Sequence, residues 1–179
     1  MTNPELLQIE SERLVYRQWR ASDIEPYSAF FANPEQAKYV GGHCDRNQAW
    51  RKLTSCVGHW QLRGYGFWAI EEKSTGHFAG CVGPWLPEGW PELEVGYWIM
   101  PEMQGKGYAT EAVVRSRQAA YQHLGAATLV SYIHPDNHAS KRVAQRAGAS
   151  YEKTIELCTF GAHEVFRHPS PDTAAPPLP

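Results

Sequence analysis

The sequence predicts a single α+β domain built around a mostly antiparallel sheet. Its hydrophobic patterns run in the order strand, two helices, three strands, helix, strand, helix, two strands. The chain has 179 residues, 42% of them hydrophobic, which is enough for one domain with a substantial core. We find no internal repeat or interdomain linker, and therefore assign residues 1–168 to one domain. We expect the proline-rich tail 169–179 to be disordered.

The first elements are a strand and a helix. Residues 12–19 (ERLVYRQW) alternate between two faces in the manner of a strand. Residues 21–33 follow as a helix, with Ser22 and Glu25 spaced as a capping box. Pro34 either ends this helix or restarts it.

A second, longer helix is predicted over residues 47–64. Its apolar residues recur every three or four positions, so that Trp50 and Trp60 are expected in the core. Gly64 closes the helix. The remaining elements are strands at 67–72, 77–86 and 92–100, a helix from about 107 to 124, a strand at 127–133, a helix at 136–149 and strands at 150–157 and 162–168.

Composition and charge exclude several classes of protein. There are 17 Lys and Arg against 19 Asp and Glu, a formal net charge of -2, which argues against a general nucleic-acid binder. The four cysteines are scattered, which indicates free thiols in a reducing compartment. Neither a signal peptide nor a membrane-spanning run is evident, so we expect a cytoplasmic protein without a membrane partner.

The stretch PEMQGKGYATEA (101–112) is a glycine-rich connection from a strand into a helix, which is typical of an anion site. A Walker loop is excluded because Lys106 is followed by Gly107 and Met100 stands where the first glycine is required. A dinucleotide fingerprint fits poorly because Gly105 and Gly107 are followed by Thr110.

Gln104, Gly107 and Ala109 do match a third pattern, Gln/Arg-x-x-Gly-x-Gly/Ala. This segment resembles the pyrophosphate loop of the Gcn5-related (GNAT) N-acetyltransferases. Together with SERLVYRQWRASDIEPY, GFWAIEEKSTGHFAGCVG and HPDNHASKRVAQRAGA, it makes residues 10–168 similar to the RimJ/RimL-like ribosomal-protein alanine acetyltransferases. The resemblance implies a GNAT fold of about seven strands and four helices, with central strands that splay at an acyl-CoA site. It also implies acetyl-CoA as donor and no metal.

The same resemblance implies which residues bind the coenzyme. The pyrophosphate would be held by backbone N–H groups of Gln104, Gly105, Lys106, Gly107, Tyr108, Ala109 and Thr110, with Lys106 either adding charge or simply solvated. The pantetheine arm would follow the strand that ends at Ile99 and Met100, where Gly96 is a candidate bulge site. Asn137, an N-cap in any case, would contact the coenzyme. Lys141, Arg142 and Arg146 would face its ribose phosphate or solvent.

Two residues are candidates for proton transfer. Glu94 lies on an apolar-rich strand, where its pKa could be raised so that it acts as base, or it is an exposed strand-edge carboxylate. Ser140 falls on the apolar side of the last helix. The resemblance implies a serine or a tyrosine near the sulfur as general acid; we choose Ser140, with Tyr151 and Tyr132 as substitutes.

The acceptor site is expected outside the coenzyme core. Trp85, Glu88, Trp90 and Glu92 would suit a cationic amine, or form a polar loop whose tryptophans cover the sheet edge. His43 and Cys44 either reach the site or are bystanders, and Pro135 argues against a metal on His134 and His138.

The function implied is transfer of an acetyl group from acetyl-CoA to a primary amine by direct attack in a ternary complex. The amine is a protein N-terminus or a small molecule. The alternative is a catalytically silent acyl-CoA-binding module, and the chain is a monomer or a homodimer.

One position departs from the resembled subgroup. Ala149 stands where a phenylalanine is usual, and we expect Phe160 or Trp98 to fill the missing volume.

Overall fold

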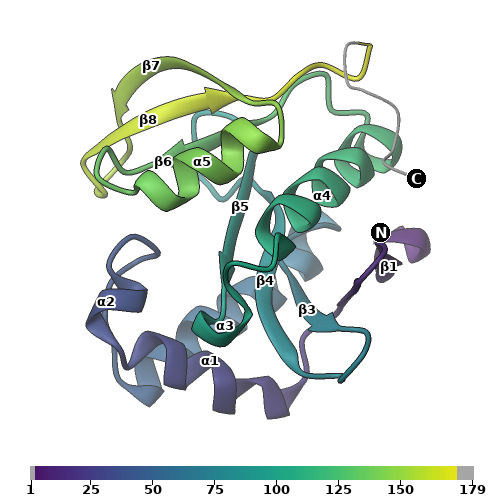
Figure 1. Cartoon of the computed structure of the whole chain (residues 1–179), viewed down its shortest axis with the longest axis vertical. Helices are drawn as coiled ribbons and strands as arrows, with labels where there is room; N and C mark the ends of the chain where they lie inside the picture. The colour runs from purple at the N-terminus through teal and green to yellow at the C-terminus, as the bar shows by residue number, and fades with distance from the viewer. Residues whose placement is uncertain (1–2, 173–179) are drawn as a thin grey trace.

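The computed structural model describes residues 3–172. They form an α+β fold around one mixed sheet (Figure 1). The strands are β1 (Gln8–Glu10), β2 (Leu14–Arg17), β3 (Trp68–Glu72), β4 (Phe78–Trp85), β5 (Glu94–Ile99), β6 (Val130–Ile133), β7 (Ser150–Glu156) and β8 (Ala162–Arg167). Their order across the sheet is β1-β2-β3-β4-β5-β6-β8-β7. The predicted fold class is confirmed, with β1 as a strand that the sequence pattern did not reveal.

The sheet opens at its centre, between β5 and β6. This is its one parallel pairing among the described residues, and the two strands are in register only at Glu94 and Val130. The Val130 N–H donates to the Leu93 carbonyl (3.2 Å), and the Ser131 hydroxyl donates to the Val95 carbonyl (2.8 Å). Beyond this point the strands separate, so the predicted splay of the central strands is confirmed.

Helices cover both faces of the sheet. They are α1 (Ile24–Phe31), α2 (Pro34–Ala37), α3 (Arg46–Arg63), α4 (Tyr108–Leu124) and α5 (His138–Arg146). Helix α1 packs its aromatic rings on Trp98, whereas α5 accepts a hydrogen bond from Tyr97. Because neighbouring strand residues point to opposite faces, α1 and α5 lie on opposite sides of β5. Figure 1 shows α4 and α5 together on one side.

The start of the first helix differs from the prediction. Ser22 lies inside a 3₁₀ turn and does not cap α1. The carboxylate of Asp23 instead accepts the Arg20 N–H at 2.7 Å, and Glu25 pairs with Arg46 of α3. The capping-box prediction was wrong because a 3₁₀ turn precedes α1 and moves the cap by one residue. Pro34 does restart a helix, α2.

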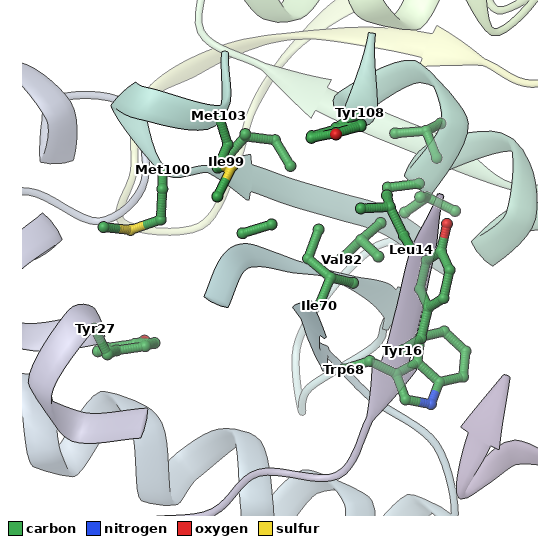
Figure 2. Packing of buried hydrophobic residues seen from close by; sticks show 14 of the residues in the cluster. Leu14, Tyr16, Tyr27, Trp68, Ile70, Val82, Ile99, Met100, Met103 and Tyr108 are labelled. Atoms are coloured by element: carbon green, nitrogen blue, oxygen red, sulfur yellow. The ribbon is translucent and has the colours of Figure 1, made fainter. Parts of the chain in front are cut away.

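The main core packs α4 on one hand and α1 and α3 on the other against the strands β2 to β5. Trp68 is fully buried, and its indole N–H donates to the Leu6 carbonyl at 2.7 Å. Figure 2 shows it beside Tyr16 of the neighbouring strand. Trp60 is buried as predicted. Trp50 is 44% exposed, so its core assignment was wrong; it shares the helix with Trp60 but faces solvent.

Gly96 is not a bulge. The β4–β5 register runs through Gly96 without a shift, and the irregularities of the described sheet lie at Ile70/Glu71 on β3 and Tyr151/Lys153 on β7. Glycine fits at 96 because a Cβ there would come within 2.7 Å of the Phe67 ring and displace it. Close approach of a ring, not an extra residue, explains this position.

The space beside Ala149, where the resembled subgroup has a phenylalanine, is filled by a side chain other than Phe160 or Trp98. Ala149 packs with Ile133, Ala144 and Phe166 in a small core between α5 and the end of the sheet. Trp98 lies against α1, and Phe160 is 54% exposed. The expectation was wrong because Phe166 of β8 reaches this space.

At the end of the domain, the Pro169 carbonyl accepts a hydrogen bond from Tyr121 at 2.7 Å. Most of the predicted disordered tail, residues 173–179, lies outside the described residues. Within residues 3–172, no helix combines the length and the apolar character needed to span a bilayer.

Candidate functional site

The glycine-rich loop joins β5 to α4 through a short 3₁₀ turn, Pro101–Met103. Gly105 has φ +76° and Gly107 has φ +84°, a left-handed conformation that other residues rarely adopt. Gly107 is also the N-cap of α4. The N–H groups of the first helical turn have no acceptor within the helix. The loop can therefore hold an anion at the positive end of the helix dipole.

Two side chains of the loop are already engaged. Gln104 donates its backbone N–H to the Pro101 carbonyl (3.2 Å) and its side-chain amide to the Ile99 carbonyl (3.0 Å). It therefore braces the loop, and its N–H is not free for a ligand. The Lys106 ammonium lies 3.6 Å from the Glu72 carboxylate.

Contacts with two other strands hold the loop in place. Arg13, just before β2, donates to the Lys106 carbonyl (2.8 Å) and to the carboxylate of Glu111 in α4 (2.8 Å). The Tyr108 hydroxyl donates to Glu72 of β3. The hydrogen bonds from Tyr108 and Thr75, together with the Lys106 charge, hold the pKa of the Glu72 carboxyl down, at about 2. The start of α4 is thus anchored before any ligand arrives.

A cavity of about 560 Å³, named here the glycine-loop cavity, lies between this loop and α5. The sequence-predicted site residues that line it are Ile99, Gln104, Gly105, Gly107, Tyr108, Ala109, Thr110, Asn137 and Ser140. Met100 and Lys106 are not among the described residues that line it. Met100 donates its N–H to the Ala79 carbonyl, toward β4.

The basic face of α5 is divided. Arg142 and Arg146 line the glycine-loop cavity. Lys141 instead pairs with Glu164 of β8 at 2.8 Å. Two arginines are thus available to an anionic ligand in this cavity.

A second cavity of about 540 Å³, named here the tryptophan cavity, lies where β5 and β6 meet. Trp85 and Trp90, which the sequence analysis offered as acceptor-binding residues, line this cavity, and so does Glu94. Its other walls come from α3, α5 and the β7–β8 connection.

Glu94 is the carboxylate of this cavity. The Trp90 indole N–H donates to its Oε2 atom at 2.8 Å. Burial raises the pKa of Glu94 to about 7, while the Trp90 indole and the backbone N–H of Tyr132 act in the opposite direction. A carboxyl group with such a pKa can exchange a proton near neutral pH. Of the two readings that the sequence left open, the exposed strand-edge carboxylate is therefore wrong.

The two cavities meet at the start of α5. The residues that line both are Tyr39, Val40, Tyr97, Trp98, Asn137 and Ser140. Asn137 caps the helix by accepting the Ser140 N–H at 3.1 Å, and the Tyr97 hydroxyl donates to the Ser140 carbonyl at 2.9 Å. Ser140 is therefore held at the junction, where a group from each cavity could meet.

Other expected contributors lie elsewhere. The carboxylate of Glu92 is bound by Arg167 (2.7 and 3.1 Å), and Glu88 is fully exposed beside Arg63. Tyr151 is 56% exposed on β7 and lines neither cavity.

The other histidines and the cysteine singled out in the sequence are divided between the tryptophan cavity and other places. Cys44 is buried in the core, and neither it nor the exposed His43 is among the lining residues. His134 lines the tryptophan cavity beside Tyr39, whereas His138 is exposed at the start of α5. Across residues 3–172 no cluster of His, Cys, Asp or Glu suited to a metal ion is present.

Sequence reasoning missed several lining residues, of which Tyr97, Tyr39 and Phe67 are examples. Tyr97 could have been found, because strand alternation places its polar ring with Val95 and Ile99 on the face that receives α4 and α5. Tyr39 and Phe67 carried no local signal, since the first follows a short helix and the second precedes a strand.

Comparison with known proteins agrees with this geometry. Residues 13–150 match the acetyltransferase (GNAT) domain family, and the chain therefore belongs to that family. An acetyltransferase from Agrobacterium tumefaciens str. C58 is 31% identical, with a TM-score of 0.83 over 91% of this chain and 94% of that one. The uncharacterized N-acetyltransferase YoaA of Bacillus subtilis (strain 168) is 28% identical over 82% of this chain and 85% of its own.

The fold is also shared with RimL, a ribosomal L7/L12 α-N-protein acetyltransferase solved in complex with coenzyme A. That structure is 18% identical, with a TM-score of 0.72 over 90% of this chain and 96% of RimL. The similarity to RimL-like enzymes that the sequence predicted is thus confirmed for the fold. The family match shows that the chain is an acetyltransferase.

Proposed function

We propose that this protein is an N-acetyltransferase that moves the acetyl group of acetyl-CoA to a primary amine in a ternary complex. The observation that carries the proposal is the meeting of two cavities at Ser140, one below an anion-binding loop and one containing a carboxyl group of raised pKa. A donor that carries phosphate groups would reach this junction from the glycine-loop cavity. An acceptor with a basic nitrogen would reach it from the tryptophan cavity.

The residues of the glycine-loop cavity fit coenzyme A. Gly105 leaves open space where a Cβ would stand, so a phosphate can approach the backbone closely. The N–H groups of Gly107 to Thr110 would bind the pyrophosphate. Arg142 and Arg146 would face the ribose phosphate. Lys106, turned to Glu72, would add long-range charge only.

The donor would supply an acyl thioester at the junction. Glu94 accepts a proton from the amine, directly or through water, while the amine nitrogen forms the new C–N bond. The Ser140 hydroxyl donates a proton to the sulfur as the C–S bond breaks, and solvent returns a proton to Ser140 while Glu94 releases the proton it accepted. Of its two substitutes, Tyr132 lines the tryptophan cavity and Tyr151 lines neither. Tyr97 holds α5 at this point and positions Ser140.

Thermal unfolding with and without acetyl-CoA tests the donor. At a hundred times its dissociation constant, acetyl-CoA should add about 2.7 kcal/mol to the free energy of unfolding. ATP and NAD at the same concentration are the controls, since they carry phosphates but no pantetheine. Protection by acetyl-CoA alone is expected, and equal protection by ATP or NAD would contradict the assignment of the donor.

Replacing Gly96 tests the acceptor side. In Gly96→Ala the new methyl group displaces the Phe67 ring, which lines the tryptophan cavity. We expect the KM for the amine to rise several-fold, with little change in the KM for acetyl-CoA. Steady-state kinetics with each substrate varied in turn would measure both. A rise confined to acetyl-CoA would show that this cavity is not the acceptor site.

A further inference from the structure

One end of the tryptophan cavity is built from aromatic rings. The Trp90 ring lies edge to face with Tyr132 (6.1 Å between centroids) and with Phe160 (5.7 Å). The buried side chain of Leu157 lies in the same wall. Phe160 is 54% exposed, so its ring borders the cavity without being needed in the core. These surfaces fit a flat apolar group.

A polar group at this end has no partner. Tyr132 is buried (8% exposed), and its hydroxyl makes no hydrogen bond. The backbone N–H of Glu92 lies near enough to act as a weak donor, which opposes the rise that burial causes in the pKa of Tyr132, but no acceptor for the hydroxyl hydrogen is present among the described residues. A buried hydroxyl left in this way is unfavourable unless a ligand or water satisfies it. The cavity therefore holds a hydrogen-bonding position next to its aromatic wall.

The carboxyl group of the cavity lies at the same end, whereas its cationic lining residues, Arg51 and Lys52, belong to α3. Trp90 stacks against this wall and also donates to Glu94, which places the carboxyl group beside the rings. Glu94 is the one Asp or Glu among the described residues that line the cavity. The nearby carboxylate of Glu92 is bound by Arg167. A cationic nitrogen would thus be drawn to Glu94.

Resting on the proposed function, we infer that the acceptor is a small primary amine that carries an aromatic ring with a polar substituent. The ring packs against the wall formed by Trp90, Phe160 and Leu157, the amine faces Glu94, and the Tyr132 hydroxyl binds the substituent. A peptide that begins with a small residue would leave the aromatic wall uncovered. Phe160 and Tyr132 are therefore specificity-determining residues.

Calorimetry on the coenzyme A-saturated protein tests this inference. The probes are tyramine, 2-phenylethylamine, n-butylamine and alanyl-alanine amide. The two aromatic amines should bind at least tenfold more tightly than the other two. Tyramine should bind about fivefold more tightly than 2-phenylethylamine, because it alone can pair with Tyr132. Equal or tighter binding of n-butylamine or of the dipeptide would overturn the inference.

Three variants test the aromatic wall and the Tyr132 hydroxyl separately. Phe160→Ala should weaken both aromatic amines about tenfold. Tyr151→Ala is the matched control, because Tyr151 is equally exposed on the same β7–β8 hairpin but lines neither cavity. Tyr132→Phe should abolish the preference for tyramine and leave 2-phenylethylamine unchanged. A preference that survives Tyr132→Phe would overturn the role of its hydroxyl.

Coenzyme A binding is measured on the same samples by thermal shift. Absence of coenzyme A binding would overturn the proposed function and this inference together. Coenzyme A binding without a preference for aromatic amines would overturn this inference alone.

Discussion

Glu94→Gln is expected to lower kcat by roughly 10²- to 10⁴-fold, because the amide cannot accept the proton of the attacking amine. Binding of acetyl-CoA should be unchanged, since Glu94 lines the tryptophan cavity and not the glycine-loop cavity. The measurement is release of free thiol at saturating acetyl-CoA with a turned-over amine. Glu88→Gln is the matched control, because Glu88 is a fully exposed carboxylate only six residues away. Retention of more than a tenth of the activity by Glu94→Gln would exclude it as the base.

The pH dependence of kcat/KM tests the assignment of Glu94 as the base independently. The pKa of Glu94 is raised to about 7 by burial, so the fraction able to accept a proton grows as the pH rises through that value. The ratio of kcat/KM between the wild type and Glu94→Gln should rise with pH and level off above about 8. Taking the ratio removes the ionisation of the amine itself, which both proteins share. A ratio that is flat from pH 6 to 8 would contradict this role.

Loss of activity in Glu94→Gln should not come from loss of folding. The folded pKa of Glu94 lies above the unfolded value of about 4.3, so its ionisation destabilises the native state progressively between these values. At pH 8 this cost reaches up to roughly 4 kcal/mol, and the neutral amide avoids it. The variant should therefore melt at the same or a higher temperature than the wild type at pH 8, with the difference disappearing at pH 4.

The coenzyme loop was predictable because its geometry is written in consecutive residues. Gly105 and Gly107 occur where the chain takes positive φ, and the helix begins directly after them. The direction of the Lys106 side chain was not predictable, because Glu72 on a strand more than thirty residues earlier determines it. Local pattern thus predicted the backbone geometry of the loop but not the direction of its lysine side chain.

The acceptor side shows the same division between local and long-range information. Trp85 and Trp90 were found because aromatic residues cluster in one short segment, and both line the cavity. Glu92 looked equally suitable, but Arg167 at the far end of the chain binds its carboxylate. The choice between Glu92 and Glu94 depends on a partner 75 residues away, which no local pattern contains.

Trp68→Ala is expected to lower the free energy of unfolding by about 3–5 kcal/mol, a large part of the 5–15 kcal/mol typical of a whole domain. Trp68 is fully buried, lies edge to face with Tyr16 and Trp60, and donates its indole N–H to the Leu6 carbonyl. The alanine variant leaves a cavity and a buried carbonyl without its donor. Urea unfolding followed by fluorescence would measure the loss. Trp68→Phe, which keeps most of the volume, should lose less and remain folded if the alanine variant does not.

Trp50→Ala is the matched control, and it tests the physical reason for the error in the core assignment. Trp50 and Trp60 share α3, and their spacing alone makes both look buried. Because Trp50 is 44% exposed, its removal should cost less than about 1 kcal/mol. A loss comparable to that of Trp68→Ala would mean that a partner covers this side of α3 in solution. A small loss would show that periodicity identifies a helix more reliably than it identifies which of its aromatic residues face the core.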